Sequence, residues 1–413
     1  MPACLLVAVA ACRGPTTRLP EPLPTTGAAR SAPDLGSPVE VLATARIGAV
    51  GDVMMHGMVQ RSAREAATPD NHGGYDALFD PVDDRIRALD VAFANLETPV
   101  APLRGSEVQP MVFNAPPVLL GSLSSVGFDV LSFANNHVYD QGRAGMKETI
   151  EQLEASGIGF VGAGRTCADA QAARIVTPNG IQVAFIGATD LYNDDLNAGP
   201  DEPCVATLGE EWVLAEAARA RSAGAELVVL SVHWGEEYVT APRADQVELA
   251  HRLVEGGVDV ILGHHPHVLQ PIEVVDTADG RRALIVYSLG NFVSNQSAWY
   301  VPGVHKVAAG NPRDGLLATF LAVRVRYGRG AKTVERVEVA DLECVPLWTL
   351  HDETGIRVVP TRDHLEQLEV ALPTATTDAE IVALSREIDE MRRRLAQVDS
   401  IVLPKERENA DRR

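Results

Sequence analysis

The chain has 413 residues, of which 46% are hydrophobic, so it can build one large domain with a sizeable core plus tails. Its 56 acidic residues exceed its 36 basic residues and give a net charge of −20, so we expect no nucleic-acid partner, because such a chain repels phosphate backbones. No apolar run of the sequence is long enough to cross a bilayer, which excludes a protein with many membrane spans.

The first twelve residues, MPACLLVAVAAC, resemble a bacterial lipoprotein signal. A short apolar run ends in small residues before Cys12, as a signal peptidase requires when that cysteine is to be lipidated. The segment departs from the pattern because it has no Lys or Arg before a rather short apolar run. We predict lipid attachment at Cys12, and the alternatives are an ordinary secretory leader or an unstructured N-terminus.

Residues 13–40 are dominated by Pro, Thr, Ser and Gly and have almost no bulky apolar side chain. Such a segment cannot bury enough surface to offset the entropy lost on ordering. We therefore expect a flexible tether between residues 1–12 and a folded domain.

From about residue 45, short apolar runs alternate with amphipathic stretches. The runs are nearly continuous and rich in Val, Ile, Leu and Phe, which is typical of strands buried on both faces. They cover residues 45–50, 90–95, 128–135, 181–188, 226–233, 258–263 and 283–290. Helical patterns cover residues 76–89, 142–156, 208–223 and 242–256. This alternation predicts an α/β fold in which helices cover the sheet.

The C-terminal part has a different pattern. Residues 315–327 and 333–345 alternate every second residue, which predicts antiparallel strands with one exposed face. Residues 377–398 have an apolar stripe that favours a helix packed on the body over a coiled coil, because the stripe is short. We expect residues 41–350 to form the main domain and 351–413 a helical C-terminal extension, frayed over the last ten residues.

The five cysteines include no CxxC pair, so a zinc ribbon or thioredoxin-type motif is not indicated. If the chain is exported, Cys167, Cys204 and Cys344 could supply one disulfide and one free thiol. Three buried free cysteines are an equally good interpretation, and the sequence does not identify the pair.

Five of the apolar runs end in polar residues of the types that bind metals. The residues at these five ends are Asp52 with His56, Asn95 with Glu97, Asn135, Asn136 and His137 with Asp140, His233, and the group His264, His265 and His267. Ligands of open α/β sheets bind beyond the carboxyl ends of the strands, and neighbouring strands are only about 5 Å apart. We therefore expect these side chains to converge.

Carboxylate, carboxamide and imidazole groups suit Mn²⁺, Fe²⁺, Zn²⁺ or Mg²⁺. Two such ions about 3.5–4 Å apart can activate water and stabilise charge on a substrate. Each residue alone has a simpler explanation: Asp52 as a helix N-cap, Asn95 as a turn residue, His233 as a core histidine. Their joint occurrence at five strand ends favours a site for divalent metal ions, and we expect two.

Six sequence blocks also resemble one family, the CapA-type capsule and poly-γ-glutamate synthesis proteins. The blocks are GDVMMH (51–56), ANLETPV (94–100), FANNHVYDQG (133–142), SVHWGEEY (231–238), GHHPHVLQPIE (263–273) and YSLGNFV (287–293). That family is similar to the calcineurin-like metallophosphoesterases. The resemblance covers about residues 45–300 and implies a four-layer α/β/β/α sandwich of metallophosphoesterase type, with a dimetal centre between the sheets.

The resemblance also implies roles for individual residues. The implied metal ligands are Asp52, Glu97, Asn136, His233, His265 and His267, the implied catalytic residues are His137 and Asp140, and the implied pocket residues are His56, Asn95, Trp234, His264 and Asn291. If the site is catalytic, Asp52, His233 and His267 would hold one ion and Asn136 and His265 the second, with Glu97 bridging or nearby.

Three departures from the superfamily pattern are visible. Met54 replaces the histidine of the first DxH motif, Glu97 replaces an aspartate, and the acid after the Asn-His pair is displaced to Asp140. His56 is a candidate to replace the missing DxH histidine. His264 is a competing ligand in the adjacent register of the GHHPH block.

The resemblance implies a lipid-anchored cell-envelope protein, facing outside the cytoplasm, that acts in synthesis or export of a capsule or anionic exopolymer. Its partners would be an anionic polymer or a phosphoester substrate, the membrane, and a polymer-synthase membrane complex. Two alternatives stay open: a non-catalytic partner of such a complex, favoured by the missing DxH histidine, and a metal-dependent amide hydrolase. A charge of −20 opposes an anionic substrate, although a metal pocket can be locally positive.

Overall fold

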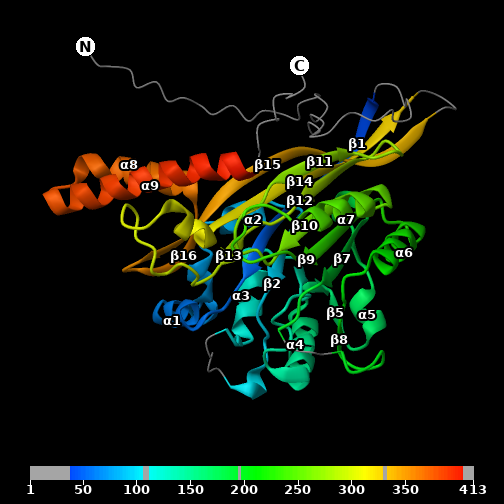
Figure 1. Cartoon of the computed structure of the whole chain (residues 1–413), viewed down its shortest axis with the longest axis horizontal. Coiled ribbons are helices and arrows are strands. Elements are labelled where there is room, and N and C mark those ends of the chain that lie inside the picture. Colours follow the sequence, from blue (N-terminus) through cyan, green and yellow to red (C-terminus); the bar gives the residue numbers. More distant parts are fainter. Residues whose placement is uncertain (1–37, 106–110, 194–196, 329–332, 403–413) are drawn as a thin grey trace, which may run out of the picture.

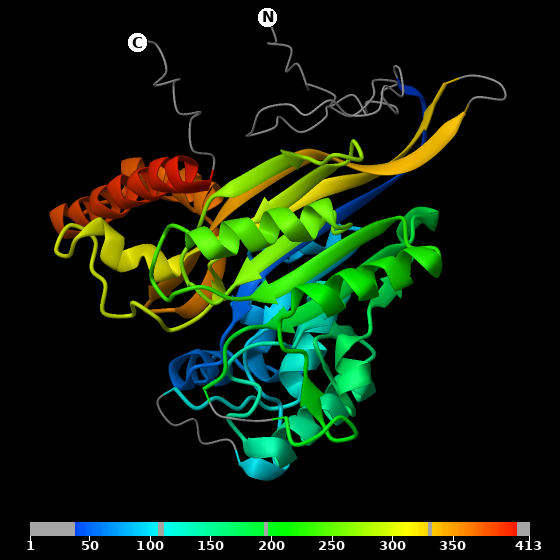
Figure 2. The same cartoon turned by 45° about the vertical axis from the view of Figure 1, so that its right-hand side comes forward.

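The fold consists of two β-sheets packed face to face, with helices on both outer sides (Figure 1, Figure 2). This computed structural model describes residues 38–105, 111–193, 197–328 and 333–402. The predictions for residues 1–12, for most of 13–40 and for the last ten residues lie outside the described residues. Residues 38–40, assigned to the tether by composition, begin strand β1.

Within the described part of the chain, the first sheet has eight strands in the order β16-β15-β14-β1-β2-β3-β4, and β13 also pairs with β1. The bounds are β1 Pro38–Val53, β2 Val91–Leu96, β3 Val130–Ser132, β4 Gly159–Val161, β13 Asn291–Val293, β14 Asp314–Tyr327, β15 Val334–Asp352 and β16 Gly355–Pro360.

The second sheet has six strands among the described residues, in the order β11-β12-β10-β9-β7-β6. The bounds are β6 Arg174–Val176, β7 Val183–Thr189, β9 Leu227–His233, β10 Val260–His264, β11 Ile272–Asp276 and β12 Arg282–Val286. The central strands β7, β9, β10 and β12 are parallel, so their carboxyl ends meet at one edge.

Apolar side chains define four layers. One core joins the facing sides of the sheets, for example Ile47 and Phe93 with Phe185 and Val229. A second core lies on the outer side of the first sheet under α1 Gly57–Glu65, α3 Val118–Val126 and α4 Gly142–Ser156. A third lies on the outer side of the second sheet under α6 Glu210–Ser222 and α7 Ala244–Glu255. The predicted α/β/β/α sandwich is therefore confirmed.

Each apolar run that was predicted to be a strand contains an observed strand. In the run 283–290 that strand is β12, and β13 begins just after the run. The helices predicted at 142–156, 208–223 and 242–256 are present as α4, α6 and α7. The helix predicted at 76–89 is wrong: the chain forms the 3₁₀ helix η1 His72–Leu78 and the short helix α2 Asp83–Arg87. Pro81 lies between them and cannot continue a helix.

The C-terminal region joins the first sheet as well as adding helices. Strands β14 and β15 pair antiparallel as predicted, but β14 is buried on both faces over most of its length. Its Leu317 packs in the outer core of the first sheet, and its Leu316 and Phe320 pack between the sheets. Strand β16, helix α8 Thr361–Ala371 and helix α9 Asp378–Val402 follow. Helices α8 and α9 lie side by side at one end of the molecule (Figure 1). Ile388 and Met391 of α9 pack on Trp348 of β15, as predicted for a helix docked on the body.

No helix in these described ranges has both the length and the apolar character that crossing a membrane requires.

A small two-stranded sheet carries a disulfide. Strands β5 Ala163–Gly164 and β8 Cys204–Val205 pair antiparallel, and Cys204 is bonded to Cys167 of helix α5 Cys167–Gln171. Cys344 is not bonded to any described cysteine. Of the two interpretations of the cysteines, one disulfide with one free thiol is the one observed.

We expect Cys204→Ser to lower the free energy of unfolding by roughly 3–4 kcal/mol, because the bond closes a loop with a sequence separation of 37. Urea unfolding with and without dithiothreitol measures this loss. The reductant should destabilise the native chain and leave Cys204→Ser unchanged. A native chain insensitive to the reductant would contradict the prediction, and Cys344→Ser is the matched control.

Candidate metal centre

The carboxyl ends of strands from both sheets meet at one place between the sheets. Asp52 lies near the end of β1, and its register partners are Asn95 on β2 and Asn291 on β13. His233 ends β9 and is the register partner of His264, which ends β10. The structure thus brings the carboxyl ends of four strands and the first residue of β13 into one buried layer.

A β-bulge turns Asp52 into this layer. Ile47 and Ala49 of β1 face the second sheet, so simple alternation would place Asp52 on the opposite face. The register with β2 shifts between Ala49 and Asp52, which changes the side that Asp52 faces. The bulge requires glycine at position 51, because a Cβ there would lie 1.8 Å from the carbonyl oxygen of Gly290.

Glu97 is at the centre of the site. Its Oε1 lies 3.6 Å from Nε2 of His233, 3.8 Å from Nε2 of His267 and 3.9 Å from Nε2 of His137. The residue is fully buried, and no described residue forms a hydrogen bond with Oε1. Burial and the nearby Asp52 raise the pKa of Glu97 well above its usual value. An unpaired buried carboxylate is costly, so this oxygen needs a cation or a proton.

Two groups of ligand atoms share Glu97. In the first ligand group, Glu97, His233 and His265 each offer one atom within 4.8 Å of the others. Asn136 joins them, because its Oδ1 lies 2.9 Å from Nε2 of His233, which is itself 3.1 Å from Nδ1 of His265.

The second ligand group consists of Asp52, Glu97 and His267, again within 4.8 Å of one another. Nδ1 of His267 lies 3.1 Å from Oδ2 of Asp52 and 3.1 Å from Oδ1 of Asn291. Both oxygens accept, so Nδ1 is the donor nitrogen of this ring and Nε2 is the nitrogen available as a ligand. No described residue forms a hydrogen bond with this buried Nε2. The arrangement leaves Nε2 of His267 facing the site, where it can bind a metal.

The ionisation of the site suits a divalent cation. Burial lowers the pKa of His265 to about 3, and burial with the neighbouring His265 lowers the pKa of His233 well below its usual value. Although burial alone would raise it, the contacts with His264 and His267 bring the pKa of Asp52 well below its usual value. Neutral imidazoles, carboxylates and one amide oxygen, with two unpartnered buried ligand atoms, fit Mn²⁺, Fe²⁺ or Zn²⁺.

The backbone at two ligand residues is strained. His265 has φ 93° and His267 has φ 55°, in the left-handed region that non-glycine residues rarely adopt. Such conformations persist where surrounding structure enforces them and are concentrated at functional sites.

His137 and Asp140 form a pair beside the ligand groups. Nδ1 of His137 lies 2.8 Å from Oδ2 of Asp140, an oxygen that also accepts from the backbone N–H of Phe113. The hydrogen bond orients the imidazole so that Nε2 faces Glu97. His137 is therefore placed for proton exchange at the edge of the site.

Asn95 and His264 lie behind Asp52. Nδ2 of Asn95 donates to Oδ1 of Asp52 over 2.8 Å, and Nδ1 of His264 lies 3.3 Å from the same oxygen. Neither residue belongs to a ligand group. Their contacts with Oδ1 orient the carboxylate of Asp52. Asn135 supports this layer, since its Nδ2 donates to the backbone of Leu96 over 2.9 Å.

Two sequence-based expectations need correction. Trp234 does not line the site: this residue follows β9 directly, packs with apolar residues of α6 and α7, and donates to the carbonyl of Tyr287 over 3.1 Å. His233 groups with Asn136 and His265 instead of with Asp52 and His267.

His56 is close to the site but belongs to neither ligand group among the described residues. Its Nδ1 accepts from the backbone N–H of Asn295 over 3.2 Å, and its ring packs edge-on against Phe113. Met54 is fully buried, so the position of the missing DxH histidine is filled by an apolar side chain.

Glu237 and Tyr238 were missed as site residues. Glu237 forms a further ligand cluster with His265 and His267. The half-exposed ring of Tyr238 lies 6.1 Å from that of His267, and its backbone N–H donates to the carbonyl of Pro266. Both residues follow Glu236 in the HWGEEY block, so reading that block to its end would have included them.

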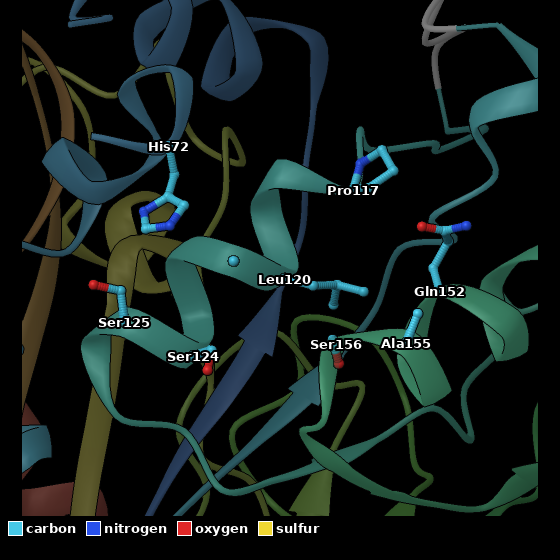
Figure 3. Close-up of a pocket in the computed structure, with 9 residues that line it drawn as sticks. His72, Pro117, Leu120, Ser124, Ser125, Gln152, Ala155 and Ser156 are labelled. Carbon is cyan, nitrogen blue, oxygen red and sulfur yellow. The ribbon is translucent and has the colours of Figure 1, made fainter. Parts of the chain in front are cut away.

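A separate pocket of about 490 Å³ lies elsewhere, between η1, α3 and α4 (Figure 3). His72, Leu120, Ser124 and Gln152 are among its lining residues, and none of the ligand residues lines it. This pocket is therefore not the candidate metal centre, which is identified by the ligand atoms that lie close together.

Sequence comparisons identify related proteins. The family model described as bacterial capsule synthesis protein PGA_cap matches residues 46–296. The capsule biosynthesis protein CapA of Bacillus anthracis is 34% identical over 254 residues, covering 60% of this chain and 59% of that protein. The PGA biosynthesis protein CapA of Bacillus subtilis (strain 168) is 34% identical over 253 residues, covering 60% and 62%. The chain thus spans less than two thirds of the length of these two relatives.

Solved structures show similarity at low sequence identity. The NAD nucleotidase of Haemophilus influenzae is 10% identical with a TM-score of 0.44, covering 86% of this chain and 67% of that one. A calcineurin-like phosphoesterase of Bacillus subtilis is 14% identical with a TM-score of 0.43, covering 86% and 99%.

Proposed function

The chain belongs to the PGA_cap family of bacterial capsule synthesis proteins, and on that premise we propose that it acts in the cell envelope, in synthesis or export of a capsule or poly-γ-glutamate-like polymer, through a divalent-metal centre. The observation that carries the metal centre is the buried Oε1 of Glu97, which lacks a hydrogen-bond partner among the described residues and faces three imidazole Nε2 atoms. The relatives named for capsule and PGA biosynthesis support the polymer.

The proposed placement outside the cytoplasm rests on the sequence and on the disulfide. Lipid attachment at Cys12 and a tether over residues 13–37 would connect the main domain, which begins with β1 at Pro38, with a membrane. The bond between Cys167 and Cys204 agrees with an oxidising compartment. Proposed partners are an anionic polymer or phosphoester substrate and a polymer-synthase membrane complex.

The proposed activity is metal-dependent hydrolysis. Divalent ions at the two ligand groups would supply Lewis acidity and an activated water. Asn136, His233 and His265 would bind one ion and Asp52 and His267 the other, with Glu97 between them. Asp140 keeps the proton on Nδ1 of His137, so that Nε2 can exchange a proton with a leaving group. The same residues could serve a phosphoester or an amide.

We expect the purified chain to contain one or two divalent ions and to hydrolyse a phosphodiester or a γ-glutamyl amide. His137→Gln should keep the metal and lose roughly 10²–10⁴-fold in turnover, because only proton exchange is removed. His251→Gln is the matched control, since that half-exposed histidine of α7 pairs with Glu273 outside the ligand groups. Elemental analysis and chromogenic bis(p-nitrophenyl) phosphate and γ-glutamyl-p-nitroanilide assays measure both quantities.

The second candidate is a non-catalytic partner of a polymer-synthesis complex with a structural metal. Buried Met54 in place of the DxH histidine favours it. Bound metal without turnover on either substrate would support this second function, and absence of bound metal would overturn the proposed metal centre.

A further inference from the structure

The C-terminal helix α9 contacts the segment around η4 through one buried arginine. Arg394 is fully buried, and its Nη1 donates to Oδ1 of Asn311 over 3.1 Å and to Oδ2 of Asp314 over 3.0 Å. Its Nη2 donates to the carbonyl of Val307. The guanidinium therefore contacts the start, the middle and the residue just after the 3₁₀ helix η4 Val307–Arg313.

The η4 segment depends on contacts from outside itself. Helices of the 3₁₀ type have poor hydrogen-bond geometry, and Pro312 inside this one has no N–H to donate. The N-cap, Lys306, forms no side-chain capping hydrogen bond. Gln397 of α9 adds a second contact, because its Nε2 donates to Oδ1 of Asn311 over 2.6 Å. Arg394 and Gln397 therefore fix the shape of η4 from α9.

The end of η4 touches a residue that orients a metal ligand. The carbonyl of Pro312 accepts from Nδ2 of Asn291 over 2.8 Å. Oδ1 of the same Asn291 lies 3.1 Å from Nδ1 of His267. The fit is tight, since a Cβ on Gly315 would lie 2.1 Å from the carbonyl oxygen of Asn291. A shift of η4 would therefore move Asn291 and turn the imidazole.

We propose that Arg394 is a positioning residue for the metal centre, acting through η4 and Asn291 on His267. The inference rests on the proposed function, because it requires His267 to bind a metal. It extends the site to α9, which lies beyond the family match that ends at residue 296. Removal of Arg394 would leave Glu390 and Asp314 buried without their cation, so stability is expected to fall together with metal affinity.

Arg394 also serves α9 itself, and the test must separate the two roles. Its Nε donates to Oε1 of Glu390, which also accepts from the hydroxyl of Tyr300. Met391 provides a matched control: it is buried in the same apolar cluster that docks α9 but is not among the residues that bond to η4.

The experiment compares Arg394→Met, Arg394→Lys and Met391→Ala in the full 413-residue chain. Each chelator-treated protein is titrated with Mn²⁺ by calorimetry, and the Mn²⁺ spectrum is recorded by electron paramagnetic resonance. Arg394→Met should weaken Mn²⁺ binding by roughly tenfold, the size expected for an outer-shell partner of a metal ligand, and alter the spectrum. Arg394→Lys should recover only part of the affinity, because one ammonium cannot span three acceptors.

Met391→Ala should lower the melting temperature and bind Mn²⁺ like the native chain. Native affinity in a folded Arg394→Met protein, or equal weakening in Met391→Ala, would overturn the inference and leave the proposed function intact. Absence of Mn²⁺ binding by the native chain would overturn both. If Arg394→Met does not fold, Asn311→Ala removes the contact from η4 and should weaken binding in the same direction, and native affinity there would overturn the inference.

Discussion

Replacing Glu97 with glutamine is expected to weaken divalent-ion binding by more than roughly 100-fold, the upper end of the cost of losing an outer-shell partner. Glu97 is the residue that both ligand groups share, so one substitution removes a ligand and a negative charge from each. The metal-free protein should be as stable as the native chain or more stable, because the substitution removes a buried carboxylate whose Oε1 has no hydrogen-bond partner among the described residues. Titration with Mn²⁺ and thermal unfolding in chelator measure the two effects.

The same residue predicts how the chelated protein responds to pH. Burial and nearby Asp52 raise the pKa of Glu97 in the folded chain above its ordinary value of 4.5. The folded protein therefore binds this proton more tightly than the unfolded chain, and the resulting stability is complete below pH 4.5. It is lost as the pH rises through the raised folded pKa. In chelator, the melting temperature of the native chain minus that of Glu97→Gln should fall over that interval. The histidines with lowered pKa values, such as His265, act in the opposite direction but equally in both proteins.

Glu148→Gln is the matched control for Glu97→Gln. Glu148 is also a buried glutamate, but it accepts from Arg104 and from the backbone of Leu103, away from the ligand groups. It should lose stability and bind Mn²⁺ normally. Native Mn²⁺ affinity in Glu97→Gln would show that the ligand groups are not metal sites.

The convergence of polar strand ends could be predicted because it follows from local sequence and from parallel pairing. His233 and His264 each end a continuous apolar run, and parallel strands place such ends at one edge. The outward position of the Trp234 side chain could also have been predicted from the sequence. Side chains alternate across a strand, so the residue next to an inward-facing His233 had to face outward.

Other features depend on contacts that no single segment encodes. Alternation along β1 would place Asp52 on the wrong face, and only the bulge beside Gly290 corrects it. The grouping of His233 with Asn136 depends on how the two sheets are offset, because His233 ends β9 of the second sheet and Asn136 lies in the turn after β3 of the first. The link from Arg394 to His267 depends on where a C-terminal helix docks.

Replacing Gly51 with alanine is expected to have the largest effect on the fold around the site, a loss of about 3 kcal/mol or more. The added Cβ would lie 1.8 Å from the carbonyl oxygen of Gly290 and 2.7 Å from its carbon, and backbone atoms cannot rotate away. Strands β1 and β13 would have to separate, which moves Asp52 and its register partner Asn291. Stability and Mn²⁺ affinity should therefore fall together.

Gly57→Ala provides the comparison that isolates this clash. Gly57 begins α1, and a Cβ there would meet no atom within 4 Å. Alanine at that position should leave Mn²⁺ affinity unchanged and raise stability by up to about 1 kcal/mol, because alanine loses less backbone entropy than glycine in a helix. Urea unfolding and Mn²⁺ titration of both variants measure the contrast. Equal stability of Gly51→Ala and Gly57→Ala would mean that β1 and β13 do not approach closely, and the bulge that directs Asp52 toward His267 would then have no structural basis.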